Sequence, residues 1–233
     1  MQLNQLNARP GIPKIYYPKD SGSFPALRDF CQWFDPQRQG SEWYPVSVGD
    51  EIVSGKEWLV KPLNNGHIVS AGPLTKSLSY ILYRVKHKLR AQYSGMDGKA
   101  IAALRKELGD DAVMEEVREP VLAYSGDTPV TNDNRFEGVR VLIHEATFLE
   151  KAELAGADPR YNVHSTLEEV MEMAAMVNPE ALVLGHFSSR YNEEEILNAV
   201  RKRIAQHRIR FAVHVLLPGK ITADILRQQP VLV

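Results

Sequence analysis

The sequence has little cysteine, with only Cys31 among its 233 residues. One thiol excludes an intramolecular disulfide framework and fits a reducing compartment. No apolar run approaches the roughly 18 residues of a membrane span, and the N-terminus lacks the charged-then-apolar pattern of a secretory signal. Neither sign of charge is in excess, because 28 Lys and Arg face 29 Asp and Glu. We therefore expect a cytoplasmic protein that does not coat nucleic acid through its overall charge.

The composition is that of a folded globular protein. Hydrophobic residues make up 44% of the chain and charged residues 24%, which excludes disorder and fibrous repeats. The length suits one large α/β domain or at most two small ones, and no Gly/Ser-rich linker divides it. We therefore expect a single domain over residues 1–233.

Alternating strand and helix patterns run along the whole chain. In the second half, residues 166–177 read as a helix that begins with a capping box, because Glu169 lies three residues after Thr166. Such alternation is typical of an α/β layered fold. The strands are expected at residues 15–17, 79–85, 121–124, 139–143, 181–184 and 211–217, with a hairpin of 46–48 and 57–60. The helices are expected at residues 25–34, 99–108, 166–177 and 193–206.

Polar residues with metal-binding side chains follow three of the expected strands. Asp127, His144 and His186 each come directly after a short run of strand formers, and His164 precedes the capped helix. Ligands gather where the strands of α/β folds end, because side chains converge there onto loops. Histidine and aspartate are suitable ligands for zinc. Position alone also permits ordinary roles, namely hydrogen-bonded structural histidines, a Gly-Asp turn and a simple helix start.

Four sequence strings decide between these alternatives. They occur in the order Tyr124–Thr128 (YSGDT), Ile143–Phe148 (IHEATF), His164–Thr166 (HST) and His186–Tyr191 (HFSSRY). In content and spacing they resemble the C-terminal half of ribonuclease Z, the endonuclease family that trims tRNA 3′ ends. The resemblance is best over residues 120–192. It extends more weakly to residues 15–18 and to the stretch from His67 to Tyr80, and residues 84–108 look most like the plant and cyanobacterial branch.

The resemblance implies a metallo-β-lactamase-like αβ/βα sandwich and a set of site residues. By resemblance, Asp127 bridges two zinc ions, His186 is a terminal ligand of the second ion, and His67 is the remaining histidine ligand. His164 matches the catalytic histidine, which stabilises charge or protonates the leaving oxygen. Glu145 would have a supporting role, and Arg190 would either orient nearby groups or be structural.

The principal signature of the family, His-x-His-x-Asp-His, is absent. No two of the seven histidines are separated by one residue, and no Asp-His pair exists. The fold is therefore expected to be N-terminally incomplete, with one weakly held zinc ion or none where a complete member holds two. An incomplete sequence, a natural fragment and a chain completed by another polypeptide are all open, and we favour truncation because the downstream motifs are intact.

The resemblance thus implies a metal-dependent hydrolase, a zinc-dependent phosphodiesterase or endoribonuclease like ribonuclease Z, and it leaves open whether the chain as given is active. The expected partners are a tRNA precursor and a second copy of the chain, with no membrane. One alternative is a metallo-hydrolase of a small phosphodiester or other ester, favoured by the lack of a long Gly/Pro-rich insertion like the tRNA-clasping arm of some members. Another is a non-catalytic binding subunit. Two basic clusters, in residues 84–90 and 201–210, would either contact phosphate or form solvated surfaces.

Overall fold

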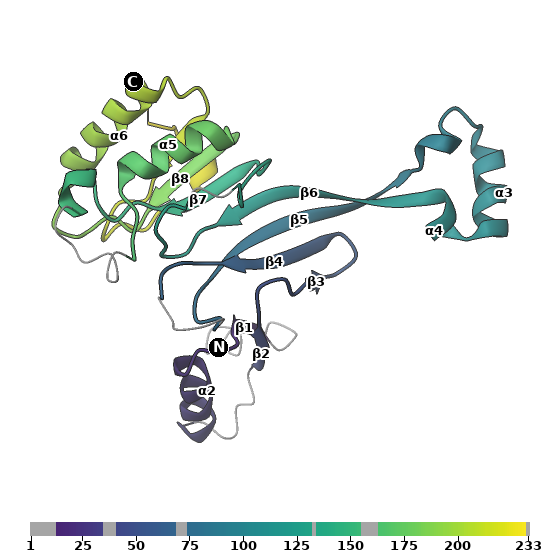
Figure 1. Cartoon of the computed structure of the whole chain (residues 1–233), viewed down its shortest axis with the longest axis horizontal. Helices are drawn as coiled ribbons and strands as arrows, with labels where there is room; N and C mark the ends of the chain where they lie inside the picture. Colours follow the sequence, from purple (N-terminus) through teal and green to yellow (C-terminus); the bar gives the residue numbers. More distant parts are fainter. Residues whose placement is uncertain (1–12, 35–40, 69–73, 132–133, 155–162, 232–233) are drawn as a thin grey trace.

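A seven-stranded mixed sheet forms the centre of the protein (Figure 1). The computed structural model describes residues 13–34, 41–68, 74–131, 134–154 and 163–231. Strands β3 to β6 pair antiparallel and β6 to β9 pair parallel. In sheet order the strands are β3 (Ile52–Ser54), β4 (Trp58–Asn64), β5 (Leu78–Leu89), β6 (Met114–Tyr124), β7 (Val141–Glu145), β8 (Ala181–Gly185) and β9 (Ala212–Val215). The expected α/β class is confirmed.

The core lies between the parallel strands and two helices, α5 (Leu167–Val177) and α6 (Glu193–His207). Leu142 and Leu182 from the strands are fully buried together with Met171 and Ile196 from the helices. Both helices lie beside β7 and β8 in Figure 1. Among the described residues, no helix combines the length and the apolar character needed to cross a membrane.

The capping box expected at the start of α5 is present. The Thr166 hydroxyl accepts a hydrogen bond from the Glu169 amide, and the Glu169 carboxylate accepts one from the Thr166 amide. Both bonds satisfy amides that have no partner within the helix. We therefore expect Thr166→Ala to lower the free energy of unfolding by about 1–2 kcal/mol, measured by urea denaturation. An unchanged midpoint with an unchanged m-value would contradict this.

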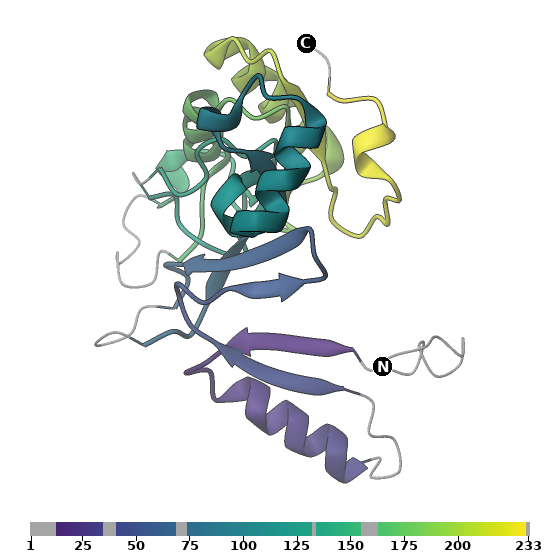
Figure 2. The ribbon, with the colours of Figure 1, turned by 90° about the vertical axis from the view of Figure 1, so that its right-hand side faces the viewer.

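A smaller unit precedes the main sheet. Strands β1 (Lys14–Pro18) and β2 (Glu42–Val46) pair in parallel, and helix α2 (Ser23–Phe34) connects them. The expected strand at residues 15–17 and the expected helix at 25–34 are therefore confirmed. No residue of α2 is buried, and Trp33 is 79% exposed. Figure 2 shows this unit below the main sheet.

The expected hairpin of residues 46–48 and 57–60 is wrong in its first strand. β4 pairs with β3, and Val46 instead ends β2, which pairs with β1. A turn from Ser47 to Asp50 ends β2, because the Asp50 carboxylate accepts the Ser47 amide and the Asp50 amide bonds to the Ser47 carbonyl. Asp and Ser favour such turns, a signal that competed with the strand pattern.

Strands β5 and β6 are longer than expected and form a projecting arm (Figure 1). Helices α3 (Gly98–Leu108) and α4 (Asp110–Val113) lie at its far end. The expected helix at 99–108 is confirmed, and Gly109 ends it with a φ of 86°. Apolar periodicity understates the length of the arm because its outer residues are largely charged and pair across the strands.

Candidate metal centre

The expected site residues come from loops at one edge of the sheet. Strands β6, β7 and β8 are parallel, so their carboxyl ends lie at the same edge. β4 runs in the same direction, because β4 and β6 are both antiparallel to β5. Asp127 follows β6, His186 follows β8 and His67 follows β4, while His164 lies in the loop before α5. The topology therefore directs all four side chains to one place.

The four side chains meet there. One donor atom each of His67, Asp127 and His164 lies within 4.8 Å of the others. His186 Nε2 lies 3.3 Å from Asp127 Oδ2. The His164 ring centroid is 5.0 Å from that of His67 and 5.3 Å from that of His186. The His186 side chain is 51% exposed and that of Asp127 36%, so the cluster is open to solvent.

His144, which the sequence placed after a strand, lies within β7 and outside this cluster. It is buried, its Nδ1 lies 2.7 Å from the Glu145 carbonyl, and its ring packs edge-on against Phe136. Burial lowers the pKa of His144 from its ordinary value to about 4, because the interior disfavours the charged imidazolium. His144 is therefore neutral at pH 7, in the structural role that the sequence left open.

Hydrogen bonds fix the proton on Nδ1 of each clustered imidazole. His67 Nδ1 lies 3.1 Å from the Val163 carbonyl, and His164 Nδ1 lies 3.0 Å from the Glu145 carboxylate. Because these oxygens only accept, both Nδ1 atoms donate. His186 Nδ1 lies 2.8 Å from the Thr147 hydroxyl, whose own hydrogen goes to Glu145. Each neutral ring therefore keeps the lone pair of Nε2 available.

This donor set fits a divalent cation. The Nε2 lone pair of His186 faces the Asp127 carboxylate at 3.3 Å. Two such groups repel each other unless a proton or a cation lies between them. Two imidazoles and one carboxylate with a further open position are typical of catalytic zinc sites. Among the described residues, the groups whose ligand atoms all lie within 4.8 Å of one another are His67 with Asp127 and His164, and Glu145 with His164 and His186. The predicted set of His67, Asp127 and His186 is not one of these groups and stays a prediction.

Glu145 is a buried carboxylate whose hydrogen bonds orient the clustered side chains. Its carboxylate is 2% exposed and accepts four hydrogen bonds, from the amides of Thr128 and Thr147, the Thr147 hydroxyl and His164 Nδ1. With its oxygens engaged in this way, Glu145 is a poor candidate for a metal ligand even though it lies near His164 and His186. It orients His164 directly and His186 through Thr147.

The backbone at two loops is adapted to the site. His186 has a φ of 58°, which is uncommon for a residue with a side chain and marks a position held by its surroundings. Two backbone hydrogen bonds hold the residues on either side of His186. The Ala146 amide donates to the Gly185 carbonyl, and the Ser188 amide donates to the Thr147 carbonyl. Gly126, just before Asp127, has a φ of 61°, which glycine adopts without strain.

Several of the cations singled out in the sequence are paired with carboxylates. In the arm, Lys86 and Lys88 both contact Glu119. In α6, Lys202 and the buried Arg203 both contact Glu150. These contacts support the solvated-surface and structural interpretations of the two basic clusters more than phosphate binding.

Among the described residues, Arg190 reaches the site through other side chains. It forms an ion pair with Glu153 and lies 5.1 Å from the Phe148 ring, whose edge packs against His164. Both roles expected for Arg190, orienting and structural, are compatible with this position.

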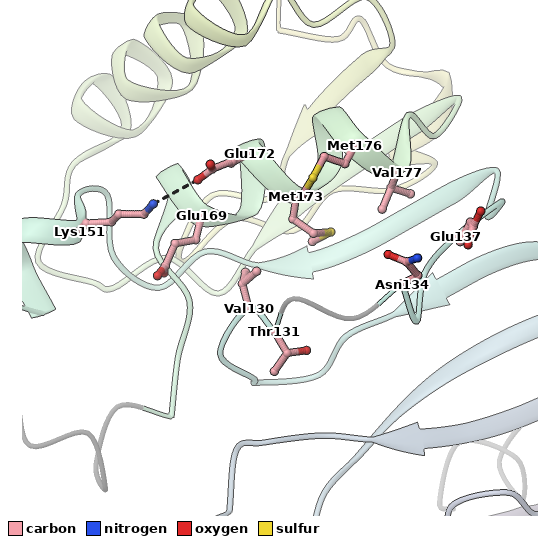
Figure 3. A pocket seen from close by; sticks show the side chains of 10 residues that line it. All are labelled: Val130, Thr131, Asn134, Glu137, Lys151, Glu169, Glu172, Met173, Met176 and Val177. Atoms are coloured by element: carbon pink, nitrogen blue, oxygen red, sulfur yellow. Dashed lines mark hydrogen bonds and ion pairs between the residues drawn. The ribbon is translucent and has the colours of Figure 1, made fainter.

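A separate cavity of about 570 Å³ lies beside α5 (Figure 3). Val130 and Met173 line its apolar part, and the Lys151–Glu172 ion pair lies at one end. None of the four clustered residues lines it. The open cluster and this cavity are therefore distinct features.

Sequence reasoning missed Thr147 and Asn65, which lie behind the cluster. Thr147 stands in the motif string around Glu145, so its position there was the available signal. Asn65 lies two residues before His67 and has no distinguishing signal in the sequence, because Ser79 and Ser125, the partners of its Nδ2, lie 14 and 60 residues away.

Comparison with known proteins agrees with this arrangement. No family model matches the chain. It is 30% identical over 166 residues to the chloroplastic tRNase Z TRZ2 of Arabidopsis thaliana, covering 69% of this chain and 44% of that protein. It is 28% identical to tRNase Z TRZ1 of the same plant, covering 66% and 54%. The chain thus spans about half the length of these curated relatives.

Solved structures establish the fold. The metallo-β-lactamase fold protein YhfI of Bacillus subtilis superposes with a TM-score of 0.52 at 12% identity, over 94% of this chain and 67% of that one. The Zn²⁺-bound PqqB of Methylobacterium extorquens gives 0.50 at 15% identity, over 92% and 66%. The chain therefore has the metallo-β-lactamase fold. Within that fold, its sequence is similar to tRNase Z proteins.

Proposed function

We propose that the chain provides the metal centre of a zinc-dependent phosphodiesterase of the ribonuclease Z type, acting on the 3′ end of a tRNA precursor. The observation that carries this proposal is the meeting of Asp127 with His67, His164 and His186 at one sheet edge. These side chains belong to four separate loops, which the sheet topology brings to one edge. The similarity to tRNase Z proteins supports the substrate class.

In this proposal, His67, Asp127 and His186 hold one divalent cation. When bound, the cation would supply Lewis-acid stabilisation of charge on a phosphate oxygen and would make a water more acidic. The His-x-His-x-Asp-His string is absent from this sequence. We therefore propose a single ion for this chain by itself.

His164 is the proposed proton donor. Its Nδ1 is held by the Glu145 carboxylate, which leaves Nε2 as the ring nitrogen that can carry the transferred proton. From that position the ring can deliver the proton to the leaving oxygen of the phosphodiester. Glu145 and Thr147 keep the ring oriented for the transfer.

The argument for a small substrate is weakened by the projecting arm. The sequence contains no long Gly/Pro-rich insertion, yet residues 78–124 extend far from the metal centre as β5, β6 and their terminal helices (Figure 1). A large substrate therefore has a surface to contact beyond the centre itself.

Cleavage of a 3′-extended tRNA precursor tests the proposal. The assay uses this chain and, in parallel, the chain with any in-frame sequence upstream of Met1, each with zinc and with a chelator. We expect zinc-dependent cleavage, lowered by about 100-fold or more by His164→Ala, because general acid catalysis contributes at least that much. Asp224→Asn, at an exposed carboxylate outside both the cluster and the arm, serves as the control and is expected to leave the rate unchanged.

Two results would contradict it. Hydrolysis of a small chromogenic phosphodiester, with the tRNA left intact, would favour the small-substrate alternative. Absence of zinc binding would favour the non-catalytic binding subunit. The expected homodimer, the single domain over residues 1–233 and zinc as the particular metal stay predictions.

A further inference from the structure

Asn65 is a buried amide behind the metal centre. It follows β4 directly and is 6% exposed. Its Nδ2 donates to the Ser125 carbonyl at 2.8 Å and contacts the Ser79 hydroxyl at 3.3 Å, while its Oδ1 accepts the His67 amide at 2.8 Å. A carbonyl can only accept and an amide can only donate, so these partners fix the orientation of the side chain.

These bonds connect the loops of two proposed ligands. His67, whose amide Asn65 holds, lies on the loop after β4, and Ser125 lies two residues before Asp127 on the loop after β6. Strand β5 separates the two loops in the sheet. One side chain therefore spans the gap between the two ligand loops.

The loop of Asp127 is also packed onto this amide. A Cβ atom at Gly126 would lie 3.2 Å from Asn65 Nδ2 and 3.3 Å from the Leu78 carbonyl oxygen. A side chain at position 126 would therefore crowd Asn65. The position of Asp127 is set against Asn65 by packing as well as by hydrogen bonding.

We propose that Asn65 is a positioning residue, which fixes the separation of His67 and Asp127 for metal binding. This inference rests on the proposed function. Asn65 acts through the backbone of both loops and contacts neither the cation nor the substrate. Residues that orient metal ligands typically change metal affinity by about 10- to 100-fold when they are altered.

The test compares zinc affinity with stability. Zinc affinity is measured by competition with a chromogenic chelator, and stability of the metal-free protein by urea denaturation. Asn65→Ala is expected to lower zinc affinity about 10- to 100-fold and to change the absorption spectrum of bound Co²⁺.

Ser79→Ala is the matched control. Ser79 is fully buried and donates to the same Ser125 carbonyl, and it contacts the Asn65 amide at 3.3 Å, but the bond that holds the His67 amide belongs to Asn65. This variant is expected to lower stability and to leave zinc affinity within about threefold of the wild type, since the Asn65 link between the loops remains.

Asn65→Asp keeps the proposal testable if the alanine variant does not fold. The aspartate retains the acceptor for the His67 amide but loses the donor to Ser125, so a weaker loss of zinc affinity is expected. Equal losses in the Asn65 and Ser79 variants, or an unchanged affinity in both Asn65 variants, would overturn the positioning role. A wild-type chain that binds no zinc would instead overturn the proposed function and this inference with it.

Discussion

Asp127→Asn is expected to lower the zinc affinity of this chain by about 100-fold or more. Asp127 faces His186 and shares a cluster with His67 and His164. Asparagine keeps the size of the side chain but removes the charge that balances the cation. Mutation of residues that only orient metal ligands typically lowers metal affinity by about 10- to 100-fold. Loss of the charge of a ligand itself is therefore expected to lower zinc affinity by at least the upper end of that range.

Competition with a chromogenic chelator measures this change. Asp224→Asn is the matched control, since Asp224 is an exposed carboxylate whose side chain is 76% accessible to solvent. The control is expected to bind zinc like the wild type. Equal affinity in the Asp127 variant and the wild type would show that any bound zinc lies elsewhere.

His144 is expected to make the protein less stable in acid. Its pKa is lowered to about 4 in the folded state, whereas an unperturbed histidine titrates near 6.5. Between these values the unfolded chain binds a proton that the folded chain does not, so stability falls as the pH falls from about 7 to about 4. The shift corresponds to a loss of about 3 kcal/mol from this one group.

His144→Asn isolates this contribution. The asparagine amide can still donate to the Glu145 carbonyl but does not titrate, so the variant is expected to lose about 3 kcal/mol less stability than the wild type between pH 7 and pH 4. Urea denaturation at several pH values measures the difference. Burial also lowers the pKa of His214, so part of the acid sensitivity remains in the variant.

His87→Asn is the matched control for the acid experiment, because His87 lies exposed on the arm. It is expected to keep the wild-type dependence on pH. The assignment to His144 fails if its variant also keeps the full dependence.

Much of the fold could be predicted from local sequence patterns. The capping box at Thr166, the glycine that ends α3 and the apolar periodicity of α6 each depend on neighbouring residues. Strand ends followed by Asp127 and His186 could be recognised for the same reason. Local signals of this kind are informative because local preferences in natural sequences agree with the overall fold.

Features that depend on distant partners could not be predicted. The pairing of β4 with β3 was missed because the turn at Ser47 competed with the strand pattern. The length of the arm depends on charge pairs such as Lys86 with Glu119, 33 residues apart. Asn65 bonds to Ser125, 60 residues away, and nothing near it in the sequence distinguishes it from a turn residue.

X-ray absorption at the zinc edge of the chain loaded with one equivalent of zinc tests the metal centre most directly. The proposed ligands His67, Asp127 and His186 predict nitrogen and oxygen neighbours at about 2.0–2.1 Å, together with outer-shell scattering from two imidazole rings. In the His186→Asn variant, the scattering from one ring is expected to disappear. A spectrum without imidazole scattering, or one that the variant leaves unchanged, would contradict a metal centre at this edge of the sheet.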